Sequence, residues 1–162
     1  MGIPRPRAYS RALVVEVLVM MLLVSIFAVG VRVVRGATEA RATESGLTPH
    51  APIYISGNSG FTAANGVVAG NGTKENPYII EGWEINASST NGIEIRNTDA
   101  HFIIRKCYIY GGKSNYEGIY FKNVRNGIIT NTVLKENFRG AYFLLCSNNT
   151  ILNCNMSNNH WG

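Results

Sequence analysis

Apolar and polar residues alternate in short runs along most of the chain after residue 50. Each run holds four to six residues, as in Gly92–Arg96 and Gly118–Lys122, and Asn, Gly and Ser separate one run from the next. Alternation places every second side chain on one face of an extended segment. The runs are too short for helices and are rich in β-branched and aromatic residues. This pattern predicts an all-β fold of short strands.

The runs recur with a period that three glycines mark. Gly92, Gly118 and Gly140 lie 26 and 22 residues apart, and Gly162 follows 22 residues after Gly140. Aligned on these glycines, the segments place residues of like kind together at several further positions. These positions are Ile93, Ile119 and Ala141; Ile95, Phe121 and Phe143; Ile104, Ile129 and Ile151; Cys107, Thr132 and Cys154; Ile109, Leu134 and Met156; Asn131 and Asn153; and Asn137 and Asn159.

A unit of about 22 residues cannot bury its apolar face alone, but stacked units can. Each strand then pairs in register with its equivalent about 4.8 Å away, so like residues form apolar ladders inside and Asn ladders at the turns. We therefore predict a parallel β-helix, right-handed as parallel crossovers generally are. A leucine-rich repeat has a similar period but needs regularly spaced leucines, in which the chain is poor after residue 47. An antiparallel sandwich would not produce a glycine register of this kind.

The N-terminal segment has the pattern of an export signal. Arg5, Arg7 and Arg11 precede a long apolar run, Leu13–Val31, which only Glu16 interrupts. That run is nearly long enough to span a bilayer, while Ala40–Ala42 offers small residues where signal peptidase cleaves. We expect residues 1–42 to be a signal peptide or a helical membrane anchor with its linker, and both outcomes stay open. Either one predicts a protein of the cell surface, the periplasm or the extracellular space.

The formal charge of +5 belongs mainly to this segment. Residues 1–42 hold six Arg against two Glu, for a net charge of +4, and the remainder has nine basic and eight acidic residues, for a net charge of +1. A nucleic-acid binder carries a clustered basic surface. We therefore expect no nucleic-acid partner.

The stretch between the export signal and the repeats has its own composition. Ile53–Ile55 and Tyr78–Ile80 are typical of strands, turn residues lie between them, and Phe61 and Trp83 are placed to close the end of the first coil. We interpret residues 50–91 as an N-terminal cap and first coil, and residues 92–162 as the following coils. At residue 162 the last coil would leave its strand edges open, and open edges pair with other strands. We therefore expect further chain beyond residue 162, a partner that covers the open coil, or end-to-end self-association.

The chain resembles a known family in the segment NPYIIEGW, Asn76–Trp83, followed by coils of the pattern GIxIxN. This combination is similar to archaeal cell-surface β-helix proteins grouped with the NosD-like, carbohydrate-binding and sugar hydrolase (CASH) repeat domains. The resemblance covers about residues 50–162. It implies a right-handed parallel β-helix at the cell surface or in the periplasm. Relatives include a copper-site maturation factor and proteins that bind or cleave polysaccharides, so both roles remain alternatives.

The residues themselves argue against catalysis. Glycoside hydrolysis needs two carboxylates flanking the bond, and the chain holds one Asp, Asp99, in a predicted turn. Glu94 has Tyr120 and Tyr142 as its neighbours in the aligned column. A lyase would need an acidic calcium site beside its base, and no acids accompany Arg96 and Lys122. We expect a non-enzymatic module, the alternative being the N-terminal part of a lyase or hydrolase whose catalytic coils lie elsewhere.

Metal binding and disulfides are also not favoured. Cys154, Met156 and His160 are soft ligands close together in sequence, but the alignment places the first two in inward columns, where Cys and Met are common core residues. Cys107, Cys146 and Cys154 form no CxxC motif. Two coils separate Cys107 from Cys154, which exceeds the reach of a disulfide. We expect free thiols, no metal and no cofactor.

The hypothesis that remains is a structural or ligand-binding surface. Tyr120 and Tyr142 are aligned at an outward position and would form an aromatic ledge flanked by Arg96 and Lys122, suited to a polysaccharide or a cell-surface protein. Glycosylation of an exported chain is a further expectation at the Asn-x-Ser/Thr sequences. These begin at Asn71, Asn86, Asn148 and Asn155.

Overall fold

The computed structural model describes residues 46–161, which form thirteen strands and two short 3₁₀ segments. The strands are β1 (Thr48–His50), β2 (Ile53–Ser56), β3 (Val67–Ala69), β4 (Tyr78–Glu81), β5 (Trp83–Asn86), β6 (Ile93–Thr98), β7 (Phe102–Arg105), β8 (Tyr108–Tyr110), β9 (Ile119–Val124), β10 (Gly127–Thr130), β11 (Val133–Lys135), β12 (Ala141–Leu144) and β13 (Thr150–Leu152). The 3₁₀ segments are η1 (Asn58–Gly60) and η2 (Ala63–Asn65).

The predicted export segment and its apolar run, Leu13–Val31, lie outside the described residues. In the part of the chain that the structure covers, no helix has the length and apolar character that crossing a bilayer requires.

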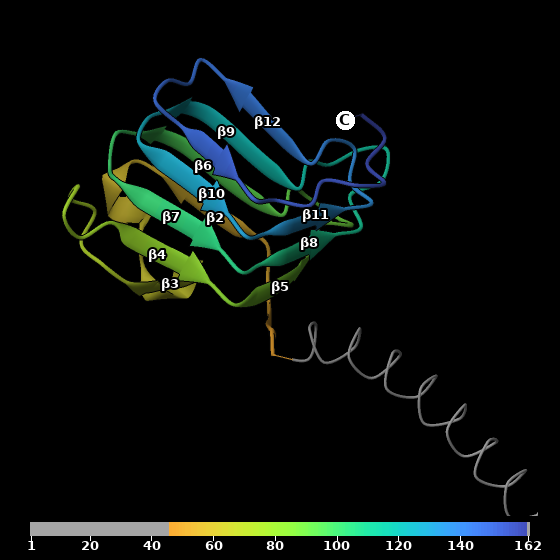
Figure 1. The fold of residues 1–162 in the computed structure, drawn as a ribbon, viewed down its shortest axis with the longest axis horizontal. Coiled ribbons are helices and arrows are strands. Elements are labelled where there is room, and N and C mark those ends of the chain that lie inside the picture. Colours follow the sequence, from red (N-terminus) through yellow and green to blue (C-terminus); the bar gives the residue numbers. More distant parts are fainter. Residues whose placement is uncertain (1–45, 162) are drawn as a thin grey trace, which may run out of the picture. The chain divides into compact units, whose positions relative to one another are not determined.

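The strands form three sheets that run side by side along the solenoid (Figure 1). Sheet A has the order β1-β5-β8-β11, sheet B the order β12-β9-β6-β2, and sheet C the order β13-β10-β7-β4-β3. The chain visits sheets C, A and B in turn, so β4, β5 and β6 make one coil and β7, β8 and β9 the next. Every pairing between equivalent strands is parallel and in register. The predicted parallel β-helix is confirmed.

The aligned apolar positions are the core columns of the solenoid. Ile95 pairs with Phe121 and Phe121 with Phe143, while Ile104, Ile129 and Ile151 stack in the same way on sheet C. Ile95, Phe121, Ile104 and Ile129 are completely buried, whereas Ile151, in the last strand described, is 41% exposed. The column prediction is therefore confirmed, because a period-2 strand sends every second side chain inward at the same level of each coil.

Close approach between coils explains the glycine column. A Cβ at Gly118 would lie 2.6 Å from the carbonyl oxygen of Gly140 and 2.9 Å from Nδ2 of Asn137, and one at Gly92 would lie 2.7 Å from the carbonyl oxygen of Gly118. All three distances are too short for a side chain. The glycines are required by the space between successive coils at the entry to sheet B.

The asparagines form two kinds of ladder. At the corner after sheet B, Nδ2 of Asn123 donates to Oδ1 of Asn97 at 3.1 Å, on the outside of the solenoid. Inside, Asn137 is buried and its backbone N–H donates to Oδ1 of Asn159 at 3.0 Å. Within residues 46–161 no buried side-chain nitrogen or oxygen lacks a hydrogen-bond partner. The expected Asn ladders at the turns are confirmed.

Each coil needs a residue with positive φ at the corner after sheet B. That position holds Gly57, Asn97 and Asn123 in successive coils, with φ values of 71°, 51° and 54°, and then Leu145 with φ of 55°. Gly and Asn tolerate this conformation, whereas other residues meet a steric cost of about 1–2 kcal/mol. Leu145 is also 77% exposed, so its side chain recovers little of that cost by burial.

We expect Leu145→Asn to stabilise the protein by about 1 kcal/mol, because Asn relieves the backbone strain at this corner. Urea unfolding at constant slope measures the change. The matched control is Leu144→Asn, one residue earlier within β12, which should bring no gain. Equal effects of the two substitutions would show that the left-handed backbone is not the cause.

The N-terminal segment closes the first coil with aromatic residues. Phe61 is buried and stacks on Tyr78 with ring centroids 4.7 Å apart, and it also contacts Phe102. Nε1 of Trp83 donates to the carbonyl oxygen of Gly66 at 2.8 Å. One pairing departs from the parallel pattern, since β3 runs antiparallel to β4. A short return of the chain before the coils begin produces this antiparallel edge.

Candidate functional site

The outward face of sheet B brings together the residues that the sequence singles out. Tyr54, Glu94, Tyr120 and Tyr142 stand in one column, one residue per coil. The neighbouring outward column holds Ser56, Arg96, Lys122 and Leu144. The structure thus places Tyr120, Tyr142, Arg96 and Lys122 on a single face of the solenoid.

The two tyrosine rings stack along the solenoid axis. Their centroids are 5.7 Å apart and their planes differ by 23°. At this separation two rings overlap in an offset stack, because they could not lie side by side in one plane. The rings therefore turn much of their faces toward each other.

Guanidinium groups extend this stack at both ends. The guanidinium carbon of Arg139 lies 3.8 Å from the centroid of the Tyr142 ring, and that of Arg96 lies 5.3 Å from the Tyr120 centroid. Both distances are in the range of cation–π contacts. The order along the face is Arg96, Tyr120, Tyr142 and Arg139, which we call the Arg–Tyr stack.

Carboxylates hold both guanidinium groups in place. Nε of Arg96 donates to Oε1 of Glu94 at 2.5 Å, and Nη2 of Arg139 donates to Oε1 of Glu117 at 2.5 Å. Hydrogen bonds to these carboxylates raise the pKa of Arg96 and of Arg139 above the ordinary value. Nδ2 of Asn91 also donates to Oε2 of Glu94. These contacts fix the Arg–Tyr stack before any ligand arrives.

Lys122 is different, because its ammonium group makes no ion pair with another described residue. It lies on the strand next to Arg96, in the same outward column. The face therefore offers two partly exposed tyrosine side chains and, in Lys122, a cation without an ion-pair partner among the described residues. Such an arrangement can donate hydrogen bonds to hydroxyl or acidic groups of a ligand.

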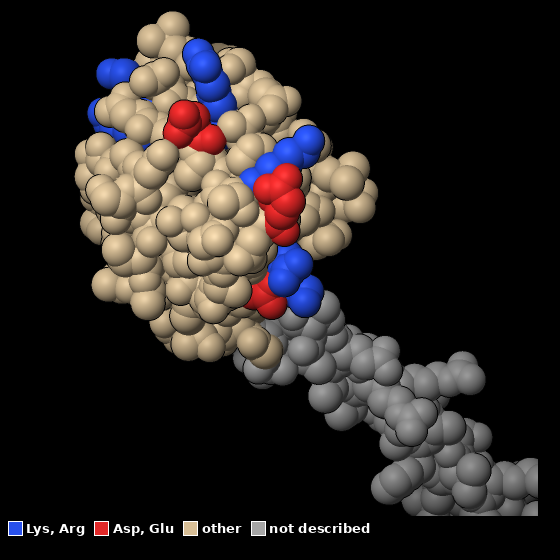
Figure 2. All heavy atoms as spheres, turned by 90° about the vertical axis from the view of Figure 1, so that its left-hand side faces the viewer, with Lys and Arg blue, Asp and Glu red and all other residues tan. Residues whose placement is uncertain are grey.

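The charge pattern elsewhere contains no extended basic surface in the view that Figure 2 presents. On this side of the molecule, Lys and Arg side chains alternate with Asp and Glu along one edge, and most of the face is uncharged. Interleaved charges of both signs do not attract a phosphate backbone.

The carboxylates of sheet B already have partners. Glu94 pairs with Arg96, and its column neighbours Tyr54 and Tyr120 carry no acid. Glu117, almost fully buried, pairs with Arg139. Both carboxylates are therefore held in ion pairs with arginine side chains.

The four sequons lie away from sheet B. All four asparagines are exposed: Asn86 ends β5, Asn155 forms a parallel β-bridge with Val133, and Asn71 and Asn148 lie in loops. Oδ1 of Asn71 accepts from the Thr73 hydroxyl at 3.0 Å. A glycan at any of these positions would start outside the outward columns of sheet B.

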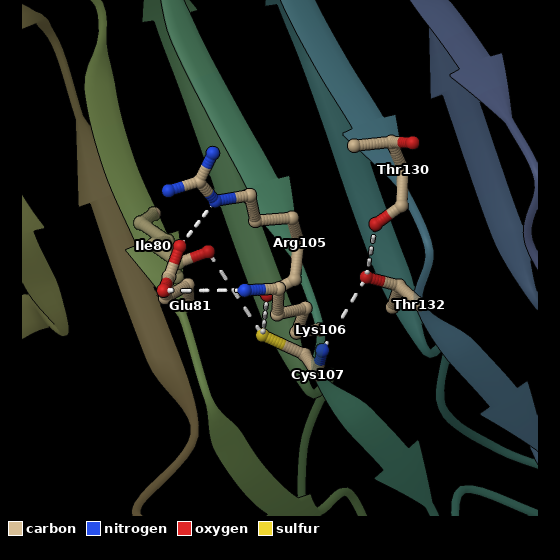
Figure 3. A network of polar contacts seen from close by, with 7 residues as sticks. All are labelled: Ile80, Glu81, Arg105, Lys106, Cys107, Thr130 and Thr132. Atoms are coloured by element: carbon tan, nitrogen blue, oxygen red, sulfur yellow. Dashed lines mark hydrogen bonds and ion pairs between the residues drawn. The ribbon is translucent and has the colours of Figure 1, made fainter.

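Cys107 lies in a polar network between sheets C and A (Figure 3). Its thiol donates to the carbonyl oxygen of Arg105 at 3.3 Å, and its backbone N–H donates to Oγ1 of Thr132 at 3.5 Å. Arg105 and Lys106 both form ion pairs with Glu81 on the surface of the same corner. Burial raises the pKa of the Cys107 thiol to about 11.

The other soft side chains that the sequence singles out lie in the last coil described. Cys154 and Met156 pack against the core, and all three cysteines are free. Among residues 46–161 no group of three His, Cys, Asp or Glu side chains is placed to hold a metal ion.

The raised pKa predicts a specific loss of stability in alkali. An unfolded chain ionises this thiol near pH 9.0, whereas the folded chain keeps it neutral to about pH 11. The native state therefore binds more protons in this window, so the stabilisation is complete below pH 9 and is lost as pH rises toward 11. We expect a loss of about 2–3 kcal/mol over the window. Urea unfolding of the reduced protein measures it, with Cys107→Ala as the comparison. Parallel pH profiles of the two proteins would contradict the assignment.

The sequence alone did not identify Asn91, Glu117 and Arg139 as site residues, although it contains a pattern that pairs them. Each stands directly before a column glycine, so the register places them in one column. Oδ1 of Asn91 accepts from the backbone N–H of Glu117, and Glu117 binds Arg139 in turn. Aligning the residues that precede the glycines would have paired them.

Comparison with known proteins supports the architecture. Residues 48–162 match the family model described as the right-handed β-helix region. Searches of the curated proteins and of the solved structures found no significant match. The family match covers most of the chain and coincides with the parallel coils, and on these grounds the chain belongs to the right-handed β-helix family.

Proposed function

We propose that this protein is a non-enzymatic β-helix module that works outside the cytoplasm and contacts a polysaccharide or another cell-surface molecule through the outward face of sheet B. The observation that carries the proposal is the Arg–Tyr stack, fixed by Glu94 and Glu117 and lying beside the unpaired Lys122. Preorganised side chains lose little entropy when they bind.

Three further observations support this proposal. Tyrosine and arginine are the residue types that most often dominate binding surfaces. None of the four sequon asparagines stands in the outward columns of sheet B. The repeat carries the pattern by which the chain resembles NosD-like and CASH proteins, some of which bind polysaccharides. Copper handling gains no support from the described residues, because Cys154 and Met156 pack against the core.

The test is affinity electrophoresis on pectate, alginate and glucans, with Tyr142→Ala as the variant. We expect the substitution to weaken binding by about tenfold or more, because it removes the ring between Tyr120 and Arg139. Tyr110→Ala is the matched control, since Tyr110 belongs to a tyrosine pair with Tyr108 on sheet A. Equal losses in both variants, or no binding by the unsubstituted protein, would reject the proposed face.

The same polysaccharides test the absence of catalysis. We expect no release of reducing ends or of unsaturated products. Calcium-dependent formation of unsaturated products that Lys122→Ala abolishes would overturn the non-enzymatic assignment.

A further inference from the structure

A hollow of about 620 Å³ lies at the corner that follows sheet B. The outer Asn ladder forms one wall and the loop after β2 forms another. Its lining residues are Asn58, Ser59, Asn97, Thr98, Asp99, Asn123 and Arg125. All of them are polar or charged, so the hollow has no aromatic or aliphatic side chain with which to hold an apolar ligand.

The exposed carboxylate of Asp99 accepts a hydrogen bond from Asn58 on the loop after β2. Nδ2 of Asn58 donates to its Oδ1 at 2.9 Å, and Oδ1 of Asn58 accepts from the hydroxyl of Thr98 at 2.6 Å. Asn126 donates to the backbone carbonyl of Asp99 from the next coil. The second carboxylate oxygen, Oδ2, has no partner among residues 46–161 and remains a free acceptor.

Donors and acceptors of the other lining residues are also available. Asn123 donates to Asn97, which leaves Nδ2 of Asn97 and Oδ1 of Asn123 without a partner within the described residues. Arg125 lines the same hollow, and its guanidinium group forms no ion pair with a described carboxylate. The hollow thus brings together one carboxylate, one guanidinium group and a pair of carboxamides.

This set of groups selects among ligand classes. Asp99 would repel an anion and Arg125 would repel a cation, whereas neither residue repels a neutral ligand. A zwitterion would use the two charged groups and leave the carboxamides unused. A sugar carries several adjacent hydroxyl groups, each of which both donates and accepts, and it can engage all four.

We propose that the corner hollow binds one neutral sugar residue through its hydroxyl groups. Asp99 accepts from a hydroxyl, Arg125 donates to a neighbouring one, and the carboxamides of Asn97 and Asn123 bind the rest. Arg96 and Lys122 directly precede Asn97 and Asn123 in the chain, so the hollow adjoins the outward face of sheet B. The ligand class rests on the proposed function, and the hollow adds a sugar subsite to that face.

The experiment is a titration of the full chain with D-glucose, D-galactose and D-mannose, followed by the side-chain amide resonances of Asn97 and Asn123. We expect at least one sugar to shift both resonances. Asp99→Asn and Arg125→Ala should each weaken that binding by about tenfold, because each removes a charge-assisted hydrogen bond. Glu75→Gln and Lys135→Ala, which change charges elsewhere, are the matched controls.

The outcomes separate the hollow from the face of sheet B. Tyr142→Ala should leave monosaccharide binding unchanged while it weakens polysaccharide binding. If polysaccharide binding is absent but the sugar shifts persist and depend on Asp99 and Arg125, the proposed function fails and the subsite stands. Sugar shifts that are absent, or that are the same in every variant, would overturn the subsite. Glycine that competes for the same resonances would replace the sugar with a zwitterionic ligand. Circular dichroism melts of each variant check that it is folded, so that a loss of binding is not a loss of the fold.

Discussion

Phe121→Ala should destabilise the protein by about 3–5 kcal/mol, the range for removing a buried aromatic ring. Phe121 is completely buried in the middle of its column, between Ile95 and Phe143. Its ring stacks on Phe143 at 4.7 Å and meets the edge of Phe102 at 5.4 Å. Because whole domains are stable by only about 5–15 kcal/mol, this loss would consume much of the total. Urea unfolding followed by tryptophan fluorescence measures it.

The control for Phe121→Ala is its neighbour on the same strand. Tyr120→Ala removes an aromatic ring of similar size from the outward face, where solvent reaches the site, and should cost about 1 kcal/mol. The register places Phe121 inward and Tyr120 outward on β9. Similar losses of stability for the two substitutions would contradict that assignment.

The second large effect is expected at the inner Asn ladder. Oδ1 of Asn137 accepts from the backbone N–H of Gly112 at 3.1 Å, and its Nδ2 donates to the carbonyl oxygen of Ile109 at 3.1 Å. Asn137→Ala leaves both backbone groups without these partners in the interior, at a cost of about 1–3 kcal/mol each. We therefore expect a loss of about 2–5 kcal/mol and faster amide exchange at Gly112.

Asn123→Gly tests whether an asparagine in the exposed outer ladder contributes less to stability than one in the buried inner ladder. It removes the outer-ladder contact to Asn97 but keeps a residue that accepts the positive φ of this corner. Water replaces the lost hydrogen bond there, so the cost should stay within about 0.5 kcal/mol. A loss at Asn137 no larger than the one at Asn123 would refute the buried ladder as a source of stability.

The coils could be predicted from sequence because the same constraint repeats in each of them. Ile95, Phe121 and Phe143 face inward at equivalent positions, and a parallel stack has one register that keeps all such columns together. The glycines mark that register since no side chain fits between the coils at their positions. A single alternating run is weak evidence for a strand, but the same run at the same position of each coil identifies both the strands and their register.

The candidate site could be predicted only in part. The column alignment places Tyr120 and Tyr142 together, but it contains nothing about ring orientation. The guanidinium group of Arg139 reaches Tyr142 from the segment before β12, and this contact depends on side-chain rotamers. The antiparallel strand β3 follows from a single chain return, which no period reveals.

The coil that begins at Gly92 is longer than the coil that begins at Gly118. This difference shows where the chain could accept new loops. Of the four extra residues between Gly92 and Gly118, three fall in the turn that contains Lys113 and Asn115, and one falls at the corner between Thr98 and Phe102. The N–H groups of Asn115 and Tyr116 both donate to the carbonyl oxygen of Gly112, and the ladder resumes at Phe138 and Tyr116. A corner that already absorbs an insertion without a shift of register can lengthen further, since each coil contacts only its neighbours. New loops with new binding specificities could therefore be grafted at this corner, on a scaffold whose strands need not change.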